Sequence, residues 1–184
     1  MRRRKVKKLK KTLLILVDGE SEQIYLNSFK TSNIHIKPEL PKKKRLNELY
    51  NYFKQERSNY DKTFWLIDLD VPIRERNIND VKNYKENFPN EIIINNPCLE
   101  FWFLLHYELK SFKNNCEDII RYLRKYSEFL NYDKSKKEVE KITNLLIDKL
   151  PNAIENSKKR ECDLESLISC SEMFKFFEAL KELQ

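Results

Sequence analysis

The residues Leu13-Leu14-Ile15-Leu16-Val17 form a short run of apolar side chains that ends at Asp18-Gly19. A continuous apolar run of this length predicts a strand that is buried on both faces, as in a parallel sheet. Residues 64–67 and 91–94 repeat this pattern, and a shorter run occupies residues 34–36. The sequence therefore predicts four strands.

Helical patterns separate the predicted strands. Apolar residues recur at helical spacing within residues 21–29, 46–53 and 79–88. The strand at 34–36 is expected to stop at Pro38. Strands that alternate with helices predict right-handed crossovers, so we expect an α/β fold with a mostly parallel four-stranded sheet flanked by helices.

The chain changes character at Pro97, which we expect in the first turn of a helix capped by Asn96. Residues 98–107 are almost all apolar, and helical patterns continue to the end of the sequence. We therefore expect a C-terminal portion that is entirely helical and packs on the core. The predicted division is a basic arm at 1–11, an α/β core at 12–110 and a helical region at 111–184.

The positive charge of the chain is concentrated in the predicted arm. The 184 residues carry a net charge of +7, but residues 1–11 hold eight basic side chains and no acidic one. The rest of the chain has 28 basic and 29 acidic residues. The arm can contact the phosphates of nucleic acid without reading sequence. A solubilising arm, or one that contacts an acidic protein, is the alternative.

Composition also excludes several classes of protein. Gly19 is the one glycine in the chain, whereas phosphate-binding P-loops and dinucleotide loops need several. No apolar run approaches the roughly 20 residues that span a bilayer, so no membrane contact is expected and we predict a cytoplasmic protein.

The four cysteines lack the spacing of a zinc site. Cys98, Cys116, Cys162 and Cys170 form no CxxC pair. Because thiols are kept reduced in the cytoplasm, four reduced thiols and no structural zinc are expected.

Acidic side chains follow two of the predicted strands. Asp18 ends the first strand, and Glu22 lies one helical turn further on, beyond the glycine that lets the backbone turn sharply. Asp68 and Asp70 follow the third strand, where residues i and i+2 point to the same side. Because the carboxyl ends of parallel strands meet at one edge of a sheet, these carboxylates and Asn95 are expected to lie together. Such oxygen ligands suit Mg²⁺ or Mn²⁺, although each acidic group alone is also typical of solvated turn residues.

Four later residues are candidates for the site, Lys134 in a catalytic role and the others in support. Glu100 is a carboxylate within an apolar helix, where burial is costly unless the group is paired or binds a metal. His106 lies on the same apolar helix and is more typical of a core histidine. Tyr132 and Lys134 belong to a basic group that could hold a phosphate or could simply be solvated.

These motifs, in this order, resemble the RloB-like proteins, a bacterial group associated with defence and restriction loci. The resemblance covers roughly residues 12–135, and its most specific part is the segment Asn96-Pro97-Cys98-Leu99-Glu100, followed by apolar residues and His106. RloB-like proteins are similar to Toprim-fold enzymes, which include topoisomerases, primases and nucleases. The resemblance thus implies a Toprim-like core.

The resemblance implies metal-dependent cleavage of nucleic acid, either DNA or RNA, in anti-phage defence or abortive infection. Asp18, Glu22, Asp68 and Asp70 would be catalytic residues that hold Mg²⁺ or Mn²⁺, and Lys134 would neutralise charge on the phosphate. The resemblance also suggests an ATPase partner protein. Asp18 departs from the Toprim pattern, which has the longer Glu here, so a non-catalytic binding or sensing module is the alternative.

Overall fold

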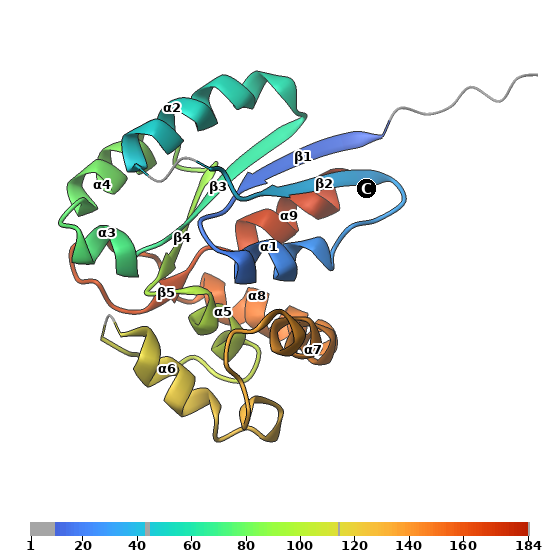
Figure 1. The fold of residues 1–184 in the computed structure, drawn as a ribbon, viewed down its shortest axis with the longest axis vertical. Coiled ribbons are helices and arrows are strands. Elements are labelled where there is room, and N and C mark those ends of the chain that lie inside the picture. The colour runs from blue at the N-terminus through green and yellow to red at the C-terminus, as the bar shows by residue number, and fades with distance from the viewer. Residues whose placement is uncertain (1–9, 43–44, 114, 184) are drawn as a thin grey trace, which may run out of the picture.

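The computed structural model describes residues 10–42, 45–113 and 115–183, so residues 1–9 of the predicted arm lie outside it. The described residues form a five-stranded sheet with the strand order β2-β1-β3-β4-β5 (Figure 1). Its strands are β1 (Lys11–Leu16), β2 (Ile34–Glu39), β3 (Lys62–Asp68), β4 (Ile92–Asn96) and β5 (Cys170–Ser171). Neighbouring strands are parallel except for β5, which runs antiparallel to β4.

Three expectations about the strands were wrong. The sheet has five strands rather than four, and the C-terminal portion is not entirely helical, because Ser171 of β5 pairs with Asn95 of β4. Pro38 does not stop β2 but lies inside it, opposite Ile15. Proline is tolerated there because β2 is an edge strand, where a missing N–H breaks no ladder.

Helices cover both faces of the sheet (Figure 1). The helices are α1 (Glu20–Asn27), α2 (Leu46–Glu56), α3 (Asp70–Arg74), α4 (Ile78–Asn87), α5 (Leu99–Leu105), α6 (Cys116–Leu123), α7 (Lys136–Leu146), α8 (Leu150–Lys158) and α9 (Phe174–Leu183). Short 3₁₀ segments occupy Arg57–Asn59, Ser127–Phe129 and Ile147–Lys149.

Alternate residues of each strand enter different cores, which explains the continuous apolar runs. Leu14 of β1 and Trp65 of β3 pack with Phe53 of α2 on one face. Leu13 and Phe64 point to the opposite face, into the core that contains residues of α1, α5 and α9. α9, at the end of the described chain, thus packs against the sheet that the first half builds.

Helix α5 starts later than the sequence pattern predicts. The peptide bond between Asn96 and Pro97 is cis, and Cys98 is the N-cap of the helix. The side chain of Asn96 does not cap α5; its amide donates to the carbonyl of Ile168. No helix within the described ranges is long and apolar enough to cross a membrane.

The cysteines are paired, contrary to the expectation of four reduced thiols. Disulfides join Cys98 to Cys116 and Cys162 to Cys170. The first disulfide links the start of α5 to the start of α6, and the second links the loop after α8 to β5.

Candidate functional site

The acidic residues lie at the topological switch point of the sheet, where the strand order reverses. From β1 the chain proceeds through α1 to the edge strand β2, and then returns through α2 to β3 on the other side of β1. Ligands of open α/β sheets bind at such a switch point, beyond the carboxyl ends of the strands. Asp18 follows β1, Asp68 ends β3, and Glu22 lies in the first turn of α1.

Asp68 is held firmly at this edge. Its side chain is buried; Oδ1 accepts a hydrogen bond from Asn95 Nδ2 at 3.1 Å, and Oδ2 accepts one from the backbone N–H of Leu99 at 3.0 Å. Asn95 is oriented in turn by the hydroxyl of Ser171, which donates to Asn95 Oδ1 at 2.6 Å. Asn95 was predicted to support the site, and its side chain positions that of Asp68 through this hydrogen bond.

Glu22 is also buried, and its carboxylate folds back over Gly19. A Cβ at position 19 would lie 2.1 Å from Oε2 of Glu22. The expectation that Gly19 serves a sharp backbone turn was wrong, because its φ of −133° and ψ of 157° are extended and open to any residue. The glycine instead leaves space for the carboxylate of Glu22.

Asp70 does not continue the strand. Leu69 has the backbone angles of a right-handed helix, and Asp70 is the first residue of α3, where its Oδ1 accepts from the N–H of Val71 at 2.8 Å. The expected i, i+2 strand geometry of Asp68 and Asp70 was therefore wrong. Asp70 is still close enough for its charge to raise the pKa of both Asp18 and Asp68.

The carboxyl groups share one electrostatic environment. Desolvation, reinforced by the charge of Glu22, raises the pKa of Asp18 to about 8, although the residue is exposed to solvent. Burial and the charges of Glu22 and Asp18 raise the pKa of Asp68 well above its usual range. Burial, with the charge of Glu100, also raises that of Glu22. The negative charges at this edge thus oppose one another.

A second network adjoins the acids. Glu100 is fully buried; its Oε1 accepts from the hydroxyl of Tyr132 at 2.8 Å, and its Oε2 lies 3.0 Å from Nζ of Lys134. Desolvation lowers the pKa of Lys134, but the charges of Glu100, Asp68 and Glu22 outweigh it and raise the pKa overall. Glu100 thus contacts two other candidates from the sequence, Tyr132 and Lys134. The positive charge of Lys134 offsets part of the negative charge of the acidic cluster.

His106 lies outside this network. The ring is buried against Trp102, and Nδ1 lies 3.0 Å from the Trp102 carbonyl oxygen. The structure describes no contact between His106 and the carboxylates of the cluster, and its position is that of a core histidine.

The carboxylates offer the oxygen donors and the negative charge that a divalent cation requires. Oxygen ligands are those that Mg²⁺ and Mn²⁺ prefer, and a cation would offset the repulsion among Asp18, Glu22 and Asp68. Among the described residues, no three carboxylate oxygens of the cluster lie within 4.8 Å of one another; the triple that does, Cys98, Glu100 and Cys116, includes two cysteines joined in a disulfide, whose sulfurs are not thiolate ligands. Binding at the acids would therefore require their side chains to turn toward one another.

Ser171 is a member of this arrangement that the sequence pattern does not indicate. Its hydroxyl supports Asn95, but it reaches the site through the two-residue strand β5. A strand this short leaves no detectable periodicity, so nothing in the sequence pattern indicated the contact.

The fold and the site define an α/β protein with a carboxylate cluster at the carboxyl edge of a mostly parallel sheet. The family model of the RloB-like protein matches residues 13–180. The chain therefore belongs to the RloB-like protein family. No curated protein and no solved structure gives a significant match to it.

Proposed function

We propose that this protein is a Toprim-like phosphodiesterase that cleaves nucleic acid with Mg²⁺ or Mn²⁺ and acts in the cytoplasm in bacterial anti-phage defence or abortive infection. One observation carries the proposal: Asp18, Glu22 and Asp68 lie at the switch point of the sheet, where the charge of Glu22 raises the pKa of both Asp18 and Asp68. Mutually repelling carboxylates at a ligand-binding edge are typical of sites that bind divalent cations.

Each residue of the cluster has a proposed task. Asp68, Glu22 and Asp70 would hold the metal, which when bound supplies an activated water and a positive charge beside the phosphate. Asp18, which is exposed, would help hold the metal or position the attacking water. The ammonium group of Lys134 would neutralise charge that develops on the phosphate oxygens, with Glu100 and Tyr132 fixing its position.

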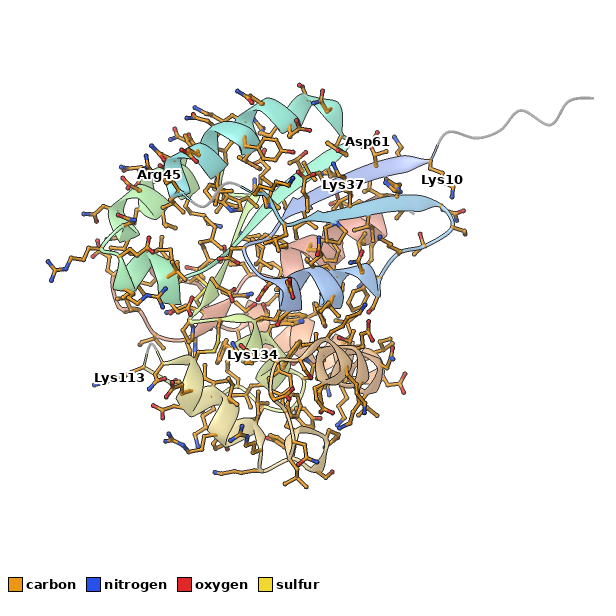
Figure 2. All side chains as sticks on the ribbon, in the orientation of Figure 1. Lys10, Lys37, Arg45, Asp61, Lys113 and Lys134 are labelled. Carbon is orange, nitrogen blue, oxygen red and sulfur yellow. A yellow bond between two sulfur atoms is a disulfide. The ribbon has the colours of Figure 1, made fainter. Side chains whose placement is uncertain are left out.

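Nucleic acid, DNA or RNA, is the proposed partner, together with an ATPase protein. The arm of residues 1–11 can bind phosphates, but it joins the sheet at the amino end of β1, opposite the acids. Figure 2 shows Lys10 and Lys134 far apart on the molecule. We therefore propose that the arm contacts nucleic acid at a distance from the cleaved bond.

A cleavage assay tests the proposal. Purified protein would be incubated with single- and double-stranded DNA and RNA, with Mn²⁺, with Mg²⁺ and with EDTA. We expect metal-dependent cleavage of at least one substrate that the variant Asp68→Asn loses and that Asp61→Asn, an exposed aspartate at the other end of β3, retains. Absence of cleavage of all substrates by the wild type, or equal cleavage by Asp68→Asn, would contradict the proposal.

The second candidate is a non-catalytic module that binds or senses a partner protein. The short side chain of Asp18 and the absence of a tight carboxylate triple among the described residues favour it. Calorimetry separates the two candidates. Binding of Mn²⁺ that Asp70→Asn abolishes supports the phosphodiesterase, whereas no binding at millimolar Mn²⁺ supports the module.

A further inference from the structure

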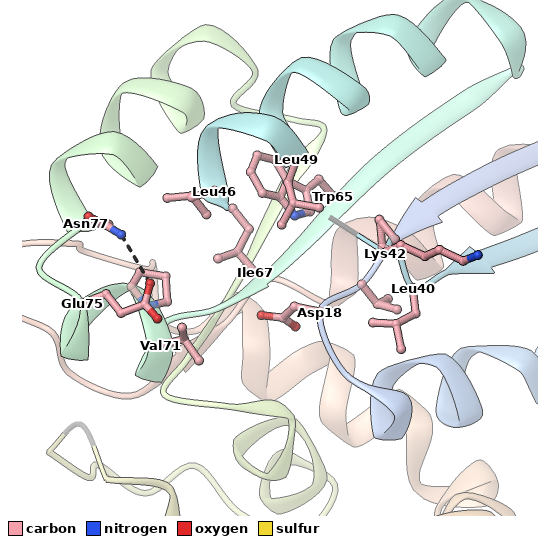
Figure 3. Close-up of a pocket in the computed structure, with 13 residues that line it drawn as sticks. Asp18, Leu40, Lys42, Leu46, Leu49, Trp65, Ile67, Val71, Glu75 and Asn77 are labelled. Atoms are coloured by element: carbon pink, nitrogen blue, oxygen red, sulfur yellow. Dashed lines mark hydrogen bonds between the residues drawn. The ribbon is translucent and has the colours of Figure 1, made fainter. Parts of the chain in front are cut away.

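A hollow of about 360 Å³ opens beside the carboxylate cluster, on the face of the sheet that α2 and α3 cover (Figure 3). Leu46 and Leu49 of α2, Ile67 of β3 and Val71 of α3 form much of its wall. The volume lies in the range of pockets that enclose small organic groups.

Polar groups are few in this hollow and lie at its edge. Asp18 borders it on the side of the acidic cluster (Figure 3). Glu75 and Asn77 lie together on another side, with Asn77 Nδ2 3.5 Å from Glu75 Oε2. At that distance the contact is weak, so both groups can turn to a ligand. Lys42 extends away from the hollow toward solvent.

A nucleobase matches the apolar wall and the polar edge of the hollow, because it has apolar faces and a hydrogen-bonding edge. Enzymes that act on nucleic acid receive extruded or single-stranded bases in pockets of this kind and read their edges with polar side chains. We propose that the hollow holds one unpaired nucleobase of the strand whose phosphate lies at the carboxylate cluster. The proposal rests on the proposed function, because nucleic acid is taken as the substrate.

Asp18 belongs to both the hollow and the carboxylate cluster, so the two sites adjoin. Asp18 lines the hollow and follows β1, at the same carboxyl edge of the sheet as Asp68 at the end of β3. A base in the hollow would therefore belong to a nucleotide next to the cleaved bond. Glu75 and Asn77 would accept from or donate to its edge, while the leucines contact its faces.

Nucleosides provide a probe that is independent of metal and of cleavage. Adenosine, cytidine, guanosine and uridine would be tested for binding by saturation-transfer NMR in EDTA. Leu46→Asp should replace an apolar contact with a hydrated carboxylate and weaken binding by about tenfold or more. Asn77→Ala should weaken it without changing the apolar wall. Leu145→Asp, at an exposed leucine on α7 outside the hollow, should bind as the wild type does. Thermal melting would confirm that each variant is folded.

The outcomes separate this proposal from the proposed function. Nucleoside binding that Leu46→Asp and Asn77→Ala weaken supports the hollow as a base site, even if no substrate is cleaved. Cleavage that Leu46→Asp leaves unchanged overturns the base site while the phosphodiesterase stands. Failure of all four nucleosides to bind the wild type, or a hollow that takes an apolar dye but no nucleoside, also overturns it.

Discussion

The carboxylate of Glu22 occupies the space that a side chain at position 19 would need, since a Cβ on Gly19 would lie 2.1 Å from Oε2. The contact ties the single glycine of the chain to one of the proposed metal ligands. Because the nearest atom is the end of a flexible side chain, an alanine at position 19 would displace the carboxylate rather than the backbone. The glycine is therefore a positioning residue for Glu22.

Gly19→Ala should weaken Mn²⁺ binding about tenfold or more, since groups that orient metal ligands have effects of that size. The cost to the free energy of unfolding should be about 1 kcal/mol, because the substitution weakens a helix N-cap and the carboxylate that it displaces is the end of a flexible side chain. Calorimetric titration and urea unfolding measure the two quantities. Glu20→Ala, at the exposed acid beside Gly19, is the control and should bind Mn²⁺ normally. Equal affinity in both variants would show that Glu22 is not a ligand.

Lys134→Met should lower the free energy of unfolding by about 2 kcal/mol. Glu100 is fully buried and Lys134 is 45% exposed, so the loss should fall between the values for buried and surface ion pairs. In urea unfolding, adding Glu100→Gln to Lys134→Met should recover part of the loss, because the uncompensated carboxylate is gone.

The control for this pair is Lys136→Met. Its Nζ lies 3.8 Å from Glu140 at the surface, and the variant should lose only about 0.3 kcal/mol. If Lys134→Met and Lys136→Met lose the same amount, Lys134 contributes no more than a surface charge.

His106 should make the fold sensitive to acid. Burial lowers its pKa to about 4, below the ordinary value of 6.5. Between these two pH values the unfolded chain binds more protons than the folded chain, so stability falls as the pH drops from 6.5 to 4, by about 3 kcal/mol. The advantage of the wild type over His106→Gln should shrink by that amount across the window. His35→Gln, at the exposed second histidine, should follow the wild type, whereas a constant difference for His106→Gln would refute the assignment.

The two disulfides can be tested directly. Protein purified without reductant should leave no thiol for iodoacetamide, as judged by intact mass. Replacing Cys98 and Cys116 by serine should cost about 3 kcal/mol of stability, and replacing Cys162 and Cys170 about 2 kcal/mol, because the first pair spans 18 residues and the second 8. Alkylation of all four cysteines in the native protein would instead support the thiols expected in the cytoplasm.

Much of the fold could be predicted from the local pattern of apolar residues. The runs that became β1, β3 and β4 were visible because strands buried on both faces carry continuous apolar residues. β5 was not predicted, because a strand of two residues is too short to show a periodicity of apolar residues. Pro38 was misjudged because the sequence does not say that β2 lies at an edge, where proline is allowed.

The grouping of the acidic residues at one edge of the sheet was more predictable than their contacts. Asp18, Asp68 and Asn95 could be grouped because parallel strands present their carboxyl ends at one edge. The contact of Glu100 with Tyr132 and Lys134 spans more than 30 residues and depends on tertiary packing. The space that Gly19 leaves for Glu22 likewise depends on how a side chain folds back, which backbone propensity cannot indicate.

Anomalous diffraction from crystals soaked in Mn²⁺ tests the central claim most directly. We predict a manganese peak bound by Asp68 and by at least two of Asp18, Glu22 and Asp70, with Lys134 still paired to Glu100. No peak at these carboxylates, or a peak only elsewhere on the molecule, would contradict the central claim.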